Sequence, residues 1–115
     1  MEAPLDDLQL DVVFTALSDR TRRDIVARLS TGEATVKELA EPYAMSMQAV
    51  SQHIRVLERS GLVSQGRHRQ TRPCRLEPAA LEAAVSWIEE SRRAWSDRMD
   101  RLETHLARLQ ERKNQ

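Results

Sequence analysis

The sequence is poor in residues that mark several large classes of protein. Its 115 residues include one cysteine (Cys74), three glycines and 3% aromatic side chains. A single cysteine excludes an internal disulfide and suits a reducing compartment. Three scattered glycines leave no Gly-rich phosphate loop. The chain also lacks a run of 18 apolar residues, and its acidic start, MEAPLDDLQLD, does not resemble a signal peptide. We therefore expect a cytoplasmic protein without membrane contact.

The composition that remains is that of a soluble, helix-rich chain. Hydrophobic residues make up 40% and charged residues 31%, which is not a disordered profile. The length predicts a single domain, residues 1–115. The sequence contains neither a nucleophile–base pair nor a zinc signature, so we expect no enzyme activity, no metal and no cofactor.

The net charge of zero conceals an uneven distribution. Residues 1–45 hold nine acids and five bases, and residues 77–115 hold eight acids and seven bases. Residues 46–76 hold six arginines and a single acid, Glu58. A local positive patch of this kind indicates an anionic partner better than the whole-chain charge does, although a solvated charged surface is the alternative.

Apolar spacing and capping residues predict a mainly α fold with a small β-hairpin. Asp19, Thr35 and Ser46 are suited to start helices, and Gly61 to end one. Pro73, within the expected second strand of the hairpin, suggests an edge strand or a bulge. The expected order is a first helix at 5–18, a helical core at 19–60 that includes a helix at 46–60, a hairpin at 61–77, and a last helix at 78–113.

The helix at 46–60 separates two kinds of side chain. Val50, Ile54 and Leu57 point inward on a helical wheel. The opposite side carries groups that can hydrogen-bond to base edges in a DNA major groove. A short helix, a tight turn and a capped second helix follow the helix-turn-helix plan, and the arginine-rich hairpin suits a wing. The predicted base-reading residues are Gln48, Ser51, Gln52 and Arg55, and the predicted DNA-backbone contacts are Ser46, Arg67, His68, Arg69 and Arg72.

The last helix carries an apolar repeat with alternating spacings of four and three residues, interrupted at Arg92. This heptad spacing is typical of helices that pair. A helix of about 30 residues is ~45 Å long, more than a compact core of this size can cover. We therefore expect its outer half to contact another chain. The repeat consists of Leu81, Val85, Ile88, Trp95, Met99, Leu102, Leu106 and Leu109.

Residues 12–76 resemble the ArsR-type winged helix-turn-helix repressors. The resemblance rests on ALSDRTRRDIVARL, VKELA and VSQHIRVLERSGLV, in that order and spacing. The tail WIEESRRAWSDRMDRLETHL further resembles a subgroup often encoded beside START-type lipid-binding-like proteins. The resemblance implies a homodimer built from the first and last helices, with Leu8 and Val12 at the interface. It also implies repression of the protein's own operon from an imperfect inverted repeat in double-stranded DNA.

The metal ligands of many such repressors are missing. Thr35 and Lys37 stand where paired cysteines would be, and the last helix has a single histidine, His105. Cys74 is either a small packed thiol or a redox sensor activated by Arg72 and Arg75. A redox or small-molecule effector of unknown identity is accordingly a further partner to consider.

Three other side chains each have two interpretations. His53 is a hydrogen-bonded structural residue or a ligand. Trp87 and Trp95 pack in the core or a dimer, or they line a ligand pocket between protomers. A different class of function is a coiled-coil protein–protein interaction module in which the basic patch is incidental; the arginine-rich wing argues against it.

Overall fold

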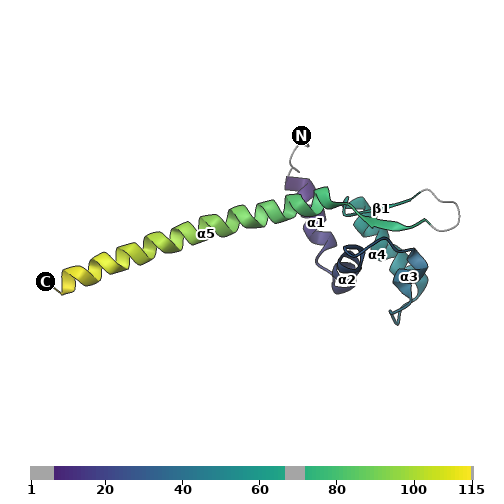
Figure 1. Ribbon diagram of the computed structural model, residues 1–115, viewed down its shortest axis with the longest axis horizontal. Coiled ribbons are helices and arrows are strands. Elements are labelled where there is room, and N and C mark those ends of the chain that lie inside the picture. The colour runs from purple at the N-terminus through teal and green to yellow at the C-terminus, as the bar shows by residue number, and fades with distance from the viewer. Residues whose placement is uncertain (1–6, 67–71, 115) are drawn as a thin grey trace. The chain divides into compact units, whose positions relative to one another are not determined.

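The computed structural model describes residues 7–66 and 72–114 (Figure 1). The chain divides into two compact units, Met1–Ala84 and Val85–Gln115. The predicted mainly α class with a small hairpin is confirmed. The elements are α1 (Asp7–Ala16), α2 (Arg20–Leu29), α3 (Val36–Ala40), α4 (Met47–Arg59), β1 (Val63–Gln65), β2 (Cys74–Leu76) and α5 (Pro78–Lys113). Among the described residues, no helix combines the length and apolarity needed to cross a bilayer.

The three predicted helix starts are confirmed. In each, the side chain of the capping residue pairs with a residue three positions further along the chain. Asp19 accepts a hydrogen bond from the Arg22 backbone N–H, and Ser46 accepts one from Ala49. Thr35 forms a reciprocal capping box with Glu38. Each cap satisfies backbone donors that the first helical turn leaves unpaired.

The end of α4 also follows the prediction. Gly61 has a φ of +83°, a conformation that glycine adopts without steric cost. The N–H of Leu62 donates to the Leu57 carbonyl (3.1 Å), and that of Gly61 donates to the Glu58 carbonyl (3.0 Å). These bonds end the helix and direct the chain into β1.

The first helix is shorter than the expected 5–18. Residues 5 and 6 lie outside the described part of the chain, and α1 ends at Ala16. The two following residues form a turn, in which Ser18 donates from its backbone and its hydroxyl to the Thr15 carbonyl. Arginine side chains of α2 donate to the carbonyls of Ala16 and Leu17, so α1 can end early without leaving them unpaired.

The hairpin corrects the expected position of Pro73, while β2 is an edge strand of a two-stranded sheet, as expected. β2 begins at Cys74, one residue after the proline, and pairs antiparallel with β1 in the register Val63↔Leu76 and Gln65↔Cys74. Proline has no N–H, but its carbonyl accepts from Gly66 N at 2.8 Å. At Cys74 an isolated bridge also covers the outer side of β2, where its N–H and carbonyl bond to Ala34 at 2.7 and 3.2 Å.

The core lies within the first unit and draws on all of its elements. Its largest fully buried side chains are Ile25, Leu39, Ile54, Leu57, Leu62, Val13, Val50 and Cys74. Burying a side chain of this size stabilises the fold by ~1.5–3 kcal/mol. The first turns of α5 join this core through Ala80 and Ala84.

Candidate nucleic-acid interface

The two faces of α4 differ as the sequence predicts. Val50, Ile54 and Leu57 are buried in the core. Three of the four predicted base-reading side chains, Gln48, Gln52 and Arg55, are exposed, and Ser51 is half-buried. The structure therefore brings the four residues together on one accessible side of a helix whose other side is anchored. Their contact with bases stays a prediction.

The start of α4 is suited to an anion. The Ser46 hydroxyl oxygen accepts from Ala49 N at 3.1 Å, which leaves the hydroxyl proton able to donate outward. Ser46 is exposed. The first backbone N–H groups of a 13-residue helix favour negative charge in front of them, so the predicted phosphate contact fits the local geometry.

A polar cluster that the sequence analysis missed joins α1, α2 and α4. The Arg22 guanidinium donates from Nε to the Ala16 carbonyl at 2.7 Å and from Nη2 to the Thr15 carbonyl at 3.2 Å. Its Nη1 lies 3.2 Å from Nδ1 of His53, in the middle of α4. Asp19 Oδ2 lies 3.7 Å from Nδ1 of His53. His53 is thus a hydrogen-bonded structural residue, the first of its two interpretations.

The Asp19 carboxylate serves both α2 and this cluster. The pKa of Asp19 lies below its usual value, first because of the hydrogen bond from the Arg22 backbone N–H and then because of the charges of His53 and Arg22, with burial acting in the opposite direction. In the sequence, the three-residue spacing of Asp19 and Arg22 indicates the helix cap. It does not indicate the contact of Arg22 with His53, which lies 31 positions further along the chain.

A second group of polar contacts holds α3 against α2. Arg28 donates to the carbonyls of Leu39 (2.9 Å) and Glu38 (3.1 Å). Its guanidinium lies 5.8 Å from the centre of the Tyr43 ring, within cation–π range. The Tyr43 hydroxyl donates to Asp24. Arg28 and Asp24 of α2 therefore hold the end of α3 and Tyr43 in the following turn, and Ser46 caps α4 where this turn ends.

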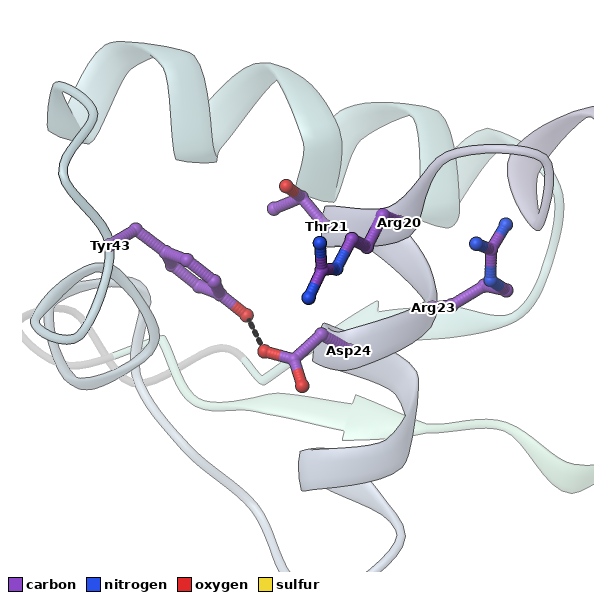
Figure 2. Close-up of a pocket in the computed structure, with 5 residues that line it drawn as sticks. All are labelled: Arg20, Thr21, Arg23, Asp24 and Tyr43. Carbon is purple, nitrogen blue, oxygen red and sulfur yellow. Dashed lines mark hydrogen bonds between the residues drawn. The ribbon is translucent and has the colours of Figure 1, made fainter.

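Figure 2 shows Tyr43 and Asp24 meeting across a surface hollow beside α2. The hollow has a volume of about 600 Å³ and is lined by Arg20, Thr21, Arg23, Asp24 and Tyr43. Desolvation, followed by the hydrogen bond to Asp24, raises the pKa of Tyr43. The Tyr43 hydroxyl and the Asp24 carboxylate are already paired with one another, so this contact has a structural role: it holds the turn before α4 against α2.

The wing divides into described and undescribed parts. Arg67, His68 and Arg69 lie outside the described residues. Arg72 is exposed before β2. Arg75 is engaged by Glu77, at 3.2 Å. The Ser64 hydroxyl donates to Glu77 at 2.5 Å, and this bond, followed by the one from Arg75, lowers the pKa of Glu77.

Cys74 has the character of a packed thiol. It is fully buried in the core, where desolvation, followed by the charge of Glu58, raises its pKa to about 11. This is the first of its two interpretations. For the second, a redox sensor activated by Arg72 and Arg75, Arg75 is already paired with Glu77. Burial therefore disfavours the reactive form that a redox sensor needs.

The residues at the usual metal positions have other surroundings. Thr35 is occupied in its capping box, and Lys37 and His105 are exposed. Within residues 7–66 and 72–114, no three His, Cys, Asp or Glu side chains come together as a metal site requires.

Most of the predicted dimer residues are exposed in the single chain. On α1, Leu8 and Val12 are exposed while Val13 is buried. Trp87 and Trp95 are also exposed, so neither packs in the core. We call the side chains of the heptad spacing that lie beyond Ala84 the α5 apolar seam. It consists of Val85, Ile88, Trp95, Met99, Leu102, Leu106 and Leu109, of which Met99 alone is half-buried. Leu81 lies earlier on α5, half-buried against the core.

Comparison with known proteins gives three kinds of match. Residues 17–65 match the family described as "Helix-turn-helix domain". The chain is 32% identical over 76 residues to the transcriptional repressor SdpR of Bacillus subtilis (strain 168), which spans 66% of this chain and 84% of SdpR. The crystal structure of RHA00566, an ArsR family transcriptional regulator, superposes with a TM-score of 0.75 at 36% identity, covering 82% of this chain and 97% of that one.

A further solved structure shares the fold. It is the homodimeric winged helix-turn-helix DNA-binding domain of Mb0332 from Mycobacterium bovis, a possible ArsR-family regulator. The match has a TM-score of 0.60 at 24% identity and covers 81% of this chain and 94% of that one. The winged helix-turn-helix architecture is thereby established from both the contacts within the chain and its relatives.

Proposed function

We propose, from the premise that this chain belongs to the ArsR family of helix-turn-helix transcriptional regulators, that it is a dimeric repressor of its own operon. Membership in a family of DNA-binding regulators sets aside the coiled-coil interaction module. Such regulators are generally not enzymes, and we propose no catalytic activity here. The observation that carries the proposal is the exposed polar side of α4 opposite its fully buried side.

The exposed side of α4 has the chemistry of direct base readout. A glutamine amide can pair with adenine through two hydrogen bonds, and an arginine guanidinium can do the same with guanine. Gln48 and Gln52 are one helical turn apart, and Arg55 follows three residues later. Ser51, with one hydroxyl that donates and accepts, suits either kind of partner. The four side chains could therefore read a few successive base pairs.

Phosphate contacts would fix the position of α4 in the groove. Ser46 presents its hydroxyl beside the start of α4, and Arg72 presents an exposed guanidinium at the wing. Arg67, His68 and Arg69 are proposed for the same role from their sequence positions alone. Contacts of this type supply affinity and orientation more than sequence choice.

The proposal of a dimer rests on the α5 apolar seam and on exposed Leu8 and Val12. Large exposed apolar patches mark protein interaction sites, and heptad spacing suits a second copy of the same helix. Two linked reading helices bind more tightly than one because the second contact becomes intramolecular. Their separation would match about one turn of DNA, ~34–36 Å, and an imperfect inverted repeat. SdpR is itself a repressor, which supports the proposed repression, and the Mb0332 domain is homodimeric, which supports the proposed dimer.

A gel-shift assay with the DNA upstream of the protein's own gene tests the proposal. The wild-type protein should bind that DNA more tightly than random DNA of equal length. Replacing Gln52 with Ala should cost ~1–3 kcal/mol at the specific site and relax base choice at one position per half-site. Gln110→Ala, the same truncation at the end of α5, is the matched control. Equal binding of upstream and random DNA by the wild type, or unchanged preference in Gln52→Ala, would contradict the proposal.

A further inference from the structure

One side chain connects the helix proposed for dimerisation with the helix proposed for base reading. Arg22, on α2, donates to two carbonyls at the end of α1, those of Ala16 and Thr15. The third position of the same guanidinium, Nη1, faces His53 of α4 at 3.2 Å. The planar guanidinium holds its donors in a rigid fork, so the three contacts fix α1 and α4 relative to one another.

The donors of Arg22 determine which atom accepts in its contact with His53. An arginine guanidinium can donate hydrogen bonds but has no acceptor. In this contact Nδ1 of His53 is therefore the acceptor, and the tautomer that forms the bond carries its proton on Nε2. Asp19 Oδ2 accepts from the Arg22 backbone N–H at 3.0 Å and lies 3.7 Å from Nδ1 of His53. The positive charge of Arg22 contributes to the lowered pKa of this carboxyl.

His53 is well placed to set the direction of the reading face. It follows Gln52 directly and lies, around the helix, between the buried positions Val50 and Leu57 and the exposed position Gln52. A hydrogen bond at this edge of α4 opposes rotation of the helix about its own axis. Packing of apolar side chains is less directional than a hydrogen bond, so the core alone leaves more freedom for such rotation.

We infer that Arg22 is a positioning residue for DNA recognition, which holds α4 through His53 at the rotation that presents Gln48 and Gln52 to the bases. The inference rests on the proposed function, because it assigns a role within the same interface. Arg22 acts through His53 and touches no base. Because the other end of its fork holds α1, which carries exposed Leu8 and Val12, it also joins the proposed dimer surface to the reading helix.

The next residue along the chain provides a charge-matched control. Arg23 also braces the junction of α1 and α2, since its Nη1 donates to the Leu17 carbonyl at 2.9 Å. Its side chain is exposed, and among the described residues no hydrogen bond or ion pair joins it to α4. Arg22→Gln and Arg23→Gln therefore remove the same charge one residue apart, but only the first releases α4.

The test measures binding to upstream DNA and to random DNA for the two arginine variants, His53→Phe, His53→Asn and the double variant Arg22→Gln/His53→Phe. Arg22→Gln should lower the ratio of specific to random affinity about tenfold, the size of one lost bidentate base contact. Arg23→Gln should leave the ratio within about twofold, as expected for a residue outside the contact. The double variant should match Arg22→Gln, because both changes break one contact. His53→Asn should recover part of the loss of His53→Phe, since its Oδ1 can accept near the former Nδ1.

A measurement without DNA separates this inference from the proposed function. In nitrogen-15 spectra, His53 of the wild type and of Arg23→Gln should show the Nε2–H tautomer, and Arg22→Gln should alter the Nδ1 signal and speed amide exchange in α4. Thermal melting identifies any variant that fails to fold, in which case the two His53 variants decide the matter. Equal ratios for the two arginine variants, additive losses in the double variant, or no recovery in His53→Asn would overturn the role of Arg22. If the wild type bound upstream and random DNA equally, the proposed function would fail, and the spectra alone would decide whether Arg22 holds α4.

Discussion

The two compact units use the same apolar residue types in opposite ways. In the first unit, Ile25, Leu39 and Leu57 have no exposed surface. In the second, Ile88 is 48% exposed and Leu106 is 54% exposed, although both belong to a regular heptad spacing. The helix itself is equally continuous in both, because its backbone bonds are local. The difference shows that apolar spacing identifies the face of a helix that is suited to burial, but not what buries it. In the first unit, other elements of the same chain bury that face.

The largest effect should come from cavities in the covered unit. Leu57→Ala should lower the free energy of unfolding by ~2–5 kcal/mol, because this α4 side chain is fully buried in the core. Leu106→Ala makes the same truncation on the exposed seam and serves as the matched control. Chemical denaturation at several protein concentrations should show a loss for Leu57→Ala at every concentration, and a loss for Leu106→Ala that depends on concentration. Equal losses at all concentrations would mean that the seam is covered within the chain.

The next effect concerns the proposed dimer contact of the α5 apolar seam. Leu102→Glu places like charges opposite one another in an apolar interface and should weaken dimer association by about 2 kcal/mol. Specific DNA binding should fall with it, while the reading helix α4 is unaltered. Sedimentation and gel-shift on the same preparation measure the two quantities together. A variant that stayed dimeric and bound its operator normally would show that the far end of α5 is not the interface.

A smaller effect is expected at the cap of α2, inside the covered unit. Asp19→Ala should cost ~1 kcal/mol of stability at neutral pH. The pKa of Asp19 is lowered in the folded state, so its contribution is full above the unfolded value, 3.8, and disappears as pH falls through the lower folded value. Thermal melts of wild type and variant should therefore begin to converge as the pH falls below about 4, and coincide only below the folded-state pKa. A difference that persisted in acid would place the effect elsewhere than in the carboxylate.

The smallest change should come from a single exposed arginine of the wing. Arg72→Ala should flatten the salt dependence of DNA binding by about one unit of slope per lost phosphate contact, and by about two in a dimer, without altering base preference. Arg75→Ala is the control, because Arg75 is already paired with Glu77. Salt titrations on specific and random DNA give both slopes. A loss of sequence preference with an unchanged slope would contradict a backbone contact.

The features that could be predicted from the sequence depend on neighbours a few positions apart. The caps at Thr35 and Ser46, the stop at Gly61 and the start of α5 at Pro78 all follow from the first or last turn of a helix. The split of α4 into a buried and an exposed side follows from helical periodicity. Family resemblance along residues 12–76 then identified the architecture, because these motifs occur in a fixed order.

The features that could not be predicted depend on segments far apart in the chain. The sequence left Cys74 as either a packed thiol or a redox sensor, and the packed character is evident only in the fold, where burial raises the pKa of the thiol to about 11. Arg22 looked like one charge among many until the fold brought it to Ala16 on one side and His53 on the other. Local backbone chemistry thus defines where the helices begin and end, whereas burial and polar contacts between helices exist only once the chain has folded, since they require residues tens of positions apart to meet.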